Sequence, residues 1–245
     1  MTEDKYGDNF LQKSKYARGN LPRHRLDFFT MPPPYMVFSE SLEKVKLPEK
    51  HEFATNDFQT VLQNRQSTRK FSNDPITLQE LSTLLKYTSG IKEKFNPNQF
   101  NKRFAPSAGG LYPHETFLVV NNVDGLKKGL YHYNVTEHSL DMLKEGDFST
   151  KSKQIGLDQL MAQRCGAVFF WVAVVPRSKW KYLQRCYRYV FMDAGHLGQN
   201  FYLVAEALNL ACCTIGAIYD DEGNKFLGVD GKDESLIYMG VVGTK

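Results

Sequence analysis

The sequence has no long hydrophobic run, few cysteines and no strong excess of either charge. No stretch reaches the roughly 20 consecutive apolar residues that span a bilayer, and the N-terminus lacks the basic flank and apolar run of a secretion signal. The 31 basic and 27 acidic residues are interspersed and leave a formal charge of +4, which is too weak to indicate nucleic-acid binding. We therefore expect a cytoplasmic protein that contacts neither a membrane nor nucleic acid.

The four cysteines are not spaced like the ligands of a metal site. Cys165, Cys186, Cys212 and Cys213 form no CxxC pair, and no histidine stands at zinc-ligand spacing from them. We predict that they are small buried hydrophobic residues in a reducing compartment and that the chain holds no metal. A nucleophilic role for Cys212 or Cys213 is disfavoured, because no histidine or basic residue lies next to them in the sequence.

The pattern of apolar residues is mixed and predicts an α+β fold. At 245 residues, 42% of them hydrophobic, the chain can bury a full core. It has no internal repeat, no regular βαβ alternation and no GxGxxG turn, which argues against a dinucleotide-binding unit. Residues 1–50 are polar, with a polyproline-like stretch at 31–35, and predict an N-terminal arm that either wraps over a surface or is a partly disordered leader. Residues 51–245 then form the folded domain.

Local patterns predict individual elements within this domain. Apolar residues at helical spacing from residue 58 predict a helix that ends in a charged turn near residue 65. A second helix should begin at Thr77, because Thr77 and Glu80 have the spacing of a capping box. A third is predicted over 193–210, with His196 near its start as a capping or packing residue. The predicted strands are 116–121, 129–134, 138–143, 167–175 and 235–242, and 91–103 is a predicted loop.

Two arginines and a serine alternate just after the first predicted helix. Arg65, Ser67 and Arg69 place two guanidinium groups and a hydroxyl within about one helical turn, and arginine suits bidentate phosphate recognition. An ordinary solvated helix end has the same composition. The motif alone therefore fits either a phosphate clamp or a charged surface.

A turn of small residues, Pro-Ser-Ala-Gly-Gly, occupies positions 106–110. Small side chains and two glycines allow backbone N–H groups to approach a flat ligand that a bulkier loop would exclude. Taken alone, a purely structural turn explains these residues equally well.

Lys181 and Tyr182 stand side by side after the apolar strand predicted over 167–175. Such a pair can transfer protons if the lysine is partly desolvated, so that its pKa falls toward the working pH. Without further context, surface charge is the simpler interpretation.

Together these segments resemble the nitroreductase-like FMN enzymes and, among them, the SagB/ThcOx-type dehydrogenases that oxidise azolines to azoles in ribosomal peptides. The resemblance spans 64–243 and is carried by the order and joint presence of four motifs. These are Arg-Gln-Ser-Thr-Arg at 65–69, Pro-Ser-Ala-Gly-Gly-Leu-Tyr-Pro at 106–113, Lys-Tyr-Leu-Gln-Arg-Cys-Tyr-Arg at 181–188 and Asp-Ala-Gly-His-Leu-Gly-Gln-Asn at 193–200. The resemblance implies a nitroreductase-like fold, a central, mostly antiparallel sheet surrounded by helices, with FMN at a homodimer interface. Residues 51–245 would be the FMN-binding domain.

The resemblance also implies which residues hold FMN. Those that would hold its phosphate and ribityl chain are Arg65, Ser67 and Arg69. Those that would line the isoalloxazine from the partner subunit are Pro106, Ser107, Ala108 and Gly109. By position more than by motif, a backbone N–H that would face flavin N5 comes from the segment Ile215, Gly216 and Ala217. Lys245 lies where a basic residue often meets the phosphate in this family.

Lys181 and Tyr182 match the Lys-Tyr pair that azoline dehydrogenases use for proton transfer and that plain nitroreductases lack. The implied reaction removes the acidic ring proton beside the C=N bond of a thiazoline or oxazoline and transfers a hydride to FMN N5, and molecular oxygen would reoxidise the flavin. The substrate would be an azoline-containing precursor peptide. Because no peptide-binding domain is recognisable beyond the short arm, leader recognition would come from another protein, which implies docking into a cyclodehydratase or synthetase complex.

Two other functions remain open. An NAD(P)H-dependent nitro or enone reductase on the same scaffold would use Lys181 and Tyr182 only to shape its pocket. A flavin-binding scaffold would support a multienzyme complex without redox chemistry of its own. The azoline dehydrogenase is the favoured hypothesis, because the Lys-Tyr pair occurs together with the small-residue turn.

Overall fold

A seven-stranded sheet forms the centre of the chain in the computed structural model, which describes residues 5–19, 21, 24–55, 57–93 and 101–245. The strand order is β1-β6-β5-β4-β7-β9-β8, and every neighbouring pair is antiparallel. This confirms the predicted α+β class and the mostly antiparallel sheet. The strands are β1 (Glu43–Lys46), β4 (His114–Val120), β5 (Gly129–Asn134), β6 (Ser139–Glu145), β7 (Ala167–Val174), β8 (Leu210–Ile215) and β9 (Glu234–Thr244).

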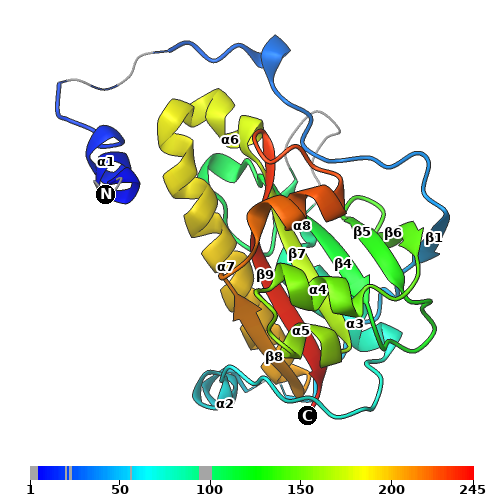
Figure 1. Cartoon of the computed structure of the whole chain (residues 1–245). Coiled ribbons are helices and arrows are strands. Elements are labelled where there is room, and N and C mark those ends of the chain that lie inside the picture. The colour runs from blue at the N-terminus through cyan, green and yellow to red at the C-terminus, as the bar shows by residue number, and fades with distance from the viewer. Residues whose placement is uncertain (1–4, 20, 22–23, 56, 94–100) are drawn as a thin grey trace.

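Helices cover both faces of the sheet (Figure 1). Side chains of successive strand residues point to opposite faces, so the fully buried β7 contributes Phe169 to one core layer and Phe170 to the other. The unbroken apolar run of β7 predicts this two-sided burial. One face packs against α3 (Leu78–Ser89) and α7 (Cys186–Ala207), and the other against α4 (Ser149–Ile155), α5 (Met161–Arg164) and α8 (Asp220–Leu227). Other helices of the described residues are α1 (Tyr6–Lys13), α2 (Phe58–Asn64) and α6 (Val175–Tyr182).

The predicted end of the first helix and the predicted start of the second are confirmed. α2 stops at Asn64, immediately before Arg65. The capping box of α3 is complete: the Thr77 hydroxyl oxygen accepts a hydrogen bond from Glu80 N at 3.1 Å, and Glu80 Oε2 accepts one from Thr77 N at 2.8 Å.

The third predicted helix begins earlier than expected. α7 starts at Cys186 rather than at Asp193, so His196 lies inside the helix. It is exposed there, and the predicted capping or packing role for it is wrong. The first turns of α7 include Arg188, which donates a hydrogen bond to Ser14 Oγ at 2.8 Å. A contact with a distant segment cannot be recognised from local periodicity.

Two predicted irregular segments contain regular structure. In the predicted loop 91–103, β2 (Ile91–Glu93) pairs with β3 (Lys102–Arg103), while 94–100 lie outside the described residues. The predicted arm 1–50 contains α1 and β1, and β1 pairs with β6 at the edge of the sheet. The sequence of β1, Glu-Lys-Val-Lys, is charged because an edge strand tolerates and uses charge. The boundary of the arm at residue 50 stays a prediction.

The four cysteines are buried, as predicted. Burial raises the pKa of the Cys165 and Cys212 thiols to about 12, which keeps both protonated and argues further against a nucleophilic role. Within the described residues, none of the helices is long and apolar enough to cross a membrane.

Candidate functional site

Asp193 of α7 holds the small-residue turn in place. Its carboxylate accepts a hydrogen bond from the Ser107 hydroxyl (Oγ to Oδ2, 2.6 Å) and another from the Ala108 backbone N–H (N to Oδ1, 3.1 Å). The Ser107 oxygen in turn accepts a hydrogen bond from the Tyr112 backbone N–H at 2.9 Å. Burial raises the pKa of Asp193, although these hydrogen bonds act in the opposite direction. Asp193 is not among the predicted site residues, although it opens the 193–200 motif.

Gly109 lies directly against the side chains of Lys181 and Tyr182. A Cβ atom added to Gly109 would stand 2.5 Å from Tyr182 Oη and 2.9 Å from Lys181 Nζ. Gly109 also has a φ of +65°, and Gly110 has one of +68° with open space around its missing side chain. Burial and then the neighbouring Tyr189 raise the pKa of Tyr182, so its phenol is protonated at neutral pH. The fold thus brings together the turn and the Lys-Tyr pair, which lie far apart in the sequence.

A buried ion pair anchors α6, the helix that ends in Lys181 and Tyr182. Arg177 Nη2 lies 2.7 Å from Glu115 Oε1, and the two side chains are only 1% and 2% exposed. The other Glu115 oxygen lies 3.1 Å from His132 Nε2. Glu115 belongs to β4, which follows the small-residue turn in the chain, so the ion pair fixes α6 relative to that turn.

The surroundings of this ion pair hold one carboxylate ionised and one imidazole neutral. Burial acts to raise the pKa of Glu115. The hydrogen bond from His132 and the charge of Arg177 outweigh this effect and lower the pKa to about 2. The pKa of the adjacent His114 is lowered to about 3, first by burial and then by the charges of Arg103 and Arg177.

The predicted phosphate clamp lies against α7 and β8. Ser67 Oγ is 2.9 Å from Tyr202 Oη, and the Thr214 backbone N–H donates to the same Tyr202 oxygen at 2.9 Å. The Arg65 guanidinium lies over the Tyr202 ring, 5.3 Å from its centroid. Arg69 is exposed, and in the described part of the chain neither arginine forms an ion pair with a carboxylate. Both cations are therefore able to bind an anionic ligand.

The remaining predicted cofactor residues lie near the two ends of β8, because Lys245 follows Thr244 of β9, which pairs with the first residue of β8, Leu210. Ile215 ends the strand and is buried, whereas Gly216 and Ala217 are exposed. Gly216 borders a cavity of about 630 Å³, and a Cβ atom on it would meet nothing within 4 Å. At the other end, Lys245 Nζ lies 3.1 Å from both carboxylate oxygens of Glu206.

The site residues of one chain form two groups along α7. The turn group consists of Ser107, Ala108, Gly109, Lys181, Tyr182 and Asp193. The clamp group consists of Arg65, Ser67, Arg69, Tyr202 and Thr214. Asp193 and Tyr202 belong to the same helix, so the two groups are roughly 13 Å apart along its axis at the α-helical rise of about 1.5 Å per residue. Among the described residues, no hydrogen bond or ion pair joins the groups.

The space behind the turn is too small for a flat ring. A cavity of about 20 Å³ lies there, bordered by Arg103, Pro106 and Asp193, and this volume suits a single water molecule. A planar ligand that contacts the turn would therefore lie on the other side, where Gly110 leaves open space.

Comparison with known proteins places the chain in a family. The model of the Nitroreductase family matches residues 62–244. The protein MJ1384 of Methanocaldococcus jannaschii, named as a candidate nitroreductase, is 31% identical over 198 residues, which cover 81% of this chain and 95% of that protein. The trifolitoxin-processing protein TfxB of Rhizobium leguminosarum is 30% identical over 143 residues, which cover 55% of this chain and 38% of TfxB.

A solved structure gives the same fold. A chain of the Escherichia coli microcin synthetase McbBCD complex, with truncated pro-MccB17 bound, matches with a TM-score of 0.60 at 19% identity and covers 97% of this chain and 86% of that one. The similarity to toxin-processing proteins agrees with the azoline dehydrogenase subgroup that the four motifs indicate. The family model covers most of the chain and MJ1384 is similar over nearly its whole length, so this chain is a member of the nitroreductase family.

Proposed function

We propose that this chain is an FMN-dependent dehydrogenase that oxidises thiazolines or oxazolines of a precursor peptide to the corresponding azoles. The contact of Gly109 with Lys181 and Tyr182 carries the proposal. It sets a proton-transfer pair against a turn whose backbone a flat ring can approach. A plain nitroreductase site does not require that pair.

FMN fits the residues of the clamp group. Arg65 and Arg69 lack carboxylate partners among the described residues, and the Ser67 hydroxyl lies beside them, as a phosphate site requires. The exposed backbone of Gly216 would face the ring, and Lys245 would add a third cation if the phosphate replaced Glu206 as its partner.

A homodimer would complete the site. The turn group and the clamp group of one chain are separated along α7, and a cofactor held by the clamp group needs a second surface to cover its ring. We propose that the partner subunit provides that surface with its own turn, residues Pro106, Ser107, Ala108 and Gly109.

The reaction requires that the azoline ring lose one proton and one hydride. When bound, FMN supplies the hydride acceptor. The raised pKa of Tyr182 keeps its phenol protonated, which suits donation of a hydrogen bond to the ring nitrogen. The amine of Lys181 lies on the same side of Gly109 and is the group positioned to take the ring proton.

The partners that we propose are a precursor peptide and a cyclodehydratase or synthetase complex. The supporting observations are the resemblance to a trifolitoxin-processing protein and the fold shared with a microcin synthetase chain in a complex that contains a pro-peptide.

The proposed activity is tested with purified, flavin-loaded protein, its cyclodehydratase and an azoline peptide. We expect the peptide to lose the mass of two hydrogen atoms. The variants Lys181→Ala and Tyr182→Phe should keep FMN and lose about 100-fold or more in turnover, whereas the exposed Lys225→Ala should match the parent. No mass loss with the parent protein would overturn the proposal, and full activity of both variants would leave only a scaffold role.

An NAD(P)H-dependent nitro or enone reductase is the second candidate, and the similarity to MJ1384 favours it. Rapid bleaching of the flavin by NADPH without oxygen would support this activity, and no bleaching would count against it.

A further inference from the structure

Side chains between residues 177 and 188 bind the backbone of the N-terminal arm at several points. Arg188 Nη2 donates to the Leu11 carbonyl at 2.7 Å, and Trp180 Nε1 donates to the Asp27 carbonyl at 2.9 Å. Arg185 Nη1 donates to the carbonyl of Ser14. These three acceptors are main-chain carbonyls, which any peptide can offer whatever its sequence. Arg188 Nε also donates to a side-chain oxygen, Ser14 Oγ, at 2.8 Å.

Aromatic contacts accompany these hydrogen bonds. The Arg185 guanidinium lies 4.1 Å from the centre of the Tyr16 ring, and that of Arg188 lies 5.7 Å from the Phe10 ring. Phe28 packs edge-on against Trp180, with ring centres 5.4 Å apart. This segment therefore recognises a peptide by its carbonyls and by occasional aromatic side chains.

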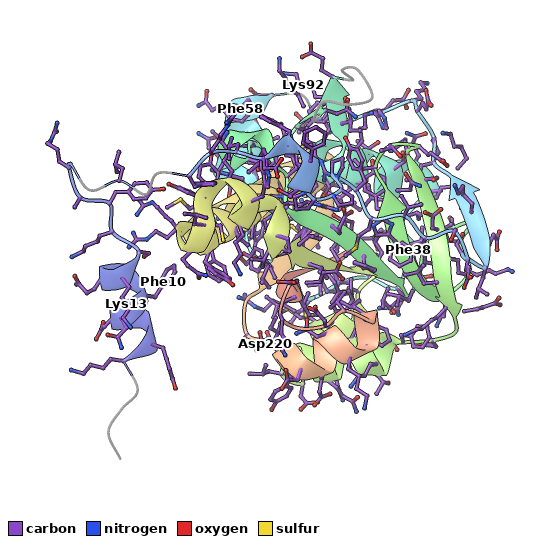
Figure 2. The ribbon with its side chains drawn as sticks, turned by 90° about the horizontal axis from the view of Figure 1, so that it is seen from above. Phe10, Lys13, Phe38, Phe58, Lys92 and Asp220 are labelled. Carbon is purple, nitrogen blue, oxygen red and sulfur yellow. The ribbon has the colours of Figure 1, made fainter. Side chains whose placement is uncertain are left out.

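The arm helix next to the two arginines buries little surface, although Ser14, which follows it and contacts both arginines, is buried. α1 has no buried residue, Tyr6 is 75% exposed and Leu11 is 52% exposed. Figures 1 and 2 show α1 beside the body of the molecule rather than packed into it. Because little apolar surface is buried, a competing peptide that offers the same carbonyls can displace α1 at small cost.

The side chains that bind the arm, Trp180, Arg185 and Arg188, lie next to the candidate catalytic pair. The rings of Tyr182 and Tyr189 are 4.6 Å apart, and the Tyr189 oxygen accepts a hydrogen bond from Arg185 Nε at 2.9 Å. Residues 178–192 contain four basic side chains and no acidic one, whereas Arg177 is buried in its ion pair with Glu115. The surface therefore favours carbonyl oxygens and acidic side chains.

We propose that Trp180, Arg185 and Arg188 form a peptide track that holds the precursor-peptide backbone flanking the azoline, and that the arm occupies this track when the peptide is absent. The inference rests on the proposed function, because it takes the substrate to be a peptide. It assigns to this chain the recognition of the peptide segment that lies next to the reacting ring.

Limited trypsin digestion of the full chain tests the track without turnover. Lys13 and Lys15 are cleavage sites within the bound part of the arm, and docking protects them. The probe is a synthetic glycine-rich peptide that carries one thiazole and no lysine or arginine. We expect the probe to accelerate cleavage at these sites. Arg188→Gln should accelerate cleavage about tenfold without the probe, because charged hydrogen bonds to the arm are lost.

The exposed Arg164→Gln is the matched control and should digest like the parent. In turnover of the corresponding thiazoline peptide, Arg188→Gln should raise KM and leave kcat near that of the parent. The track is overturned if the probe leaves arm cleavage unchanged, or if Arg188→Gln alters neither cleavage nor KM. If the protein oxidises the azoline but the probe does not change cleavage of the arm, the peptide track is refuted and the proposed function stands. If the probe accelerates cleavage but no azoline is oxidised, the proposed function is refuted and the peptide track stands.

Discussion

The backbone of Gly109 approaches the hydroxyl of Tyr182 so closely that an added methyl group would stand 2.5 Å from that oxygen. No side chain fits in this space unless Lys181 or Tyr182 moves. Gly110, the next residue, has a similar positive φ of +68° but nothing within 4 Å of its missing Cβ. An alanine at position 109 would therefore introduce both backbone strain and a steric clash, whereas an alanine at position 110 would introduce backbone strain alone.

Gly109→Ala and Gly110→Ala should lose similar stability and differ in activity. Both replace a glycine of positive φ, which costs about 1 kcal/mol of unfolding free energy. Gly109→Ala also displaces the Lys-Tyr pair, and a shift of about 1 Å can reduce kcat by about 100-fold. Denaturant unfolding and azoline turnover, each at full FMN occupancy, test this prediction. Equal kcat values for the two variants would contradict it.

Asp193→Ala should release the small-residue turn. The carboxylate accepts hydrogen bonds from the Ser107 hydroxyl and the Ala108 N–H, and its loss leaves both donors without this partner. We expect FMN to bind about tenfold or more weakly, as measured by quenching of flavin fluorescence. Gln199→Ala, at an exposed position of the same helix, is the control and should bind FMN like the parent. The prediction fails if Asp193→Ala retains the parent affinity.

The stability of the fold should fall at low pH over two overlapping pH ranges, one for His114 and one for Glu115. The pKa of His114 is lowered to about 3, so between pH 6.5 and 3 the unfolded chain takes up a proton that the folded chain does not, and stability decreases. The pKa of Glu115 is lowered to about 2, so its stabilising contribution, about 3 kcal/mol, is present above pH 4.5 and is lost as the pH falls toward 2.

Substitution of each residue should remove the part of the pH dependence of the unfolding free energy that this residue causes. His114→Gln should reduce the slope of unfolding free energy between pH 6.5 and 4.5, and Glu115→Gln the slope below pH 4.5. Glu115→Gln should also cost roughly 3–5 kcal/mol at neutral pH, because it leaves the buried Arg177 without its charge partner. Denaturant unfolding at a series of pH values measures all three effects. A parallel pH profile for parent and variants would contradict the assignment.

Local chemistry in the sequence predicts those parts of the fold that depend on near neighbours. The capping box at Thr77 and Glu80 and the buried run of β7 are of this kind. The beginning of α7 was not predictable in the same way, since the contact of Arg188 with the distant Ser14 leaves no local signal in the sequence. Asp193 likewise gains its role only when the fold brings Ser107 to it.

The clamp group should recognise the phosphate of its ligand rather than the ring. Arg69→Ala removes an exposed cation that has no carboxylate partner in the described part of the chain. It should therefore weaken FMN binding about tenfold and leave the binding of riboflavin, which lacks the phosphate, unchanged. Lys70→Ala removes a neighbouring exposed charge and is the control for a general electrostatic effect.

Tyr202→Phe should act on the same group by another route. The Tyr202 hydroxyl lies 2.9 Å from Ser67 Oγ and accepts a hydrogen bond from the Thr214 N–H. Its loss removes the contact that holds Ser67 and leaves the half-buried Thr214 N–H without this partner. We expect FMN affinity to fall by about tenfold and its salt dependence to stay the same, because both arginines remain. Titration of FMN and riboflavin at two salt concentrations distinguishes the two variants. If Arg69→Ala weakened both ligands equally, the clamp group would not be the phosphate site, and the proposal that it holds the FMN phosphate would have to be abandoned.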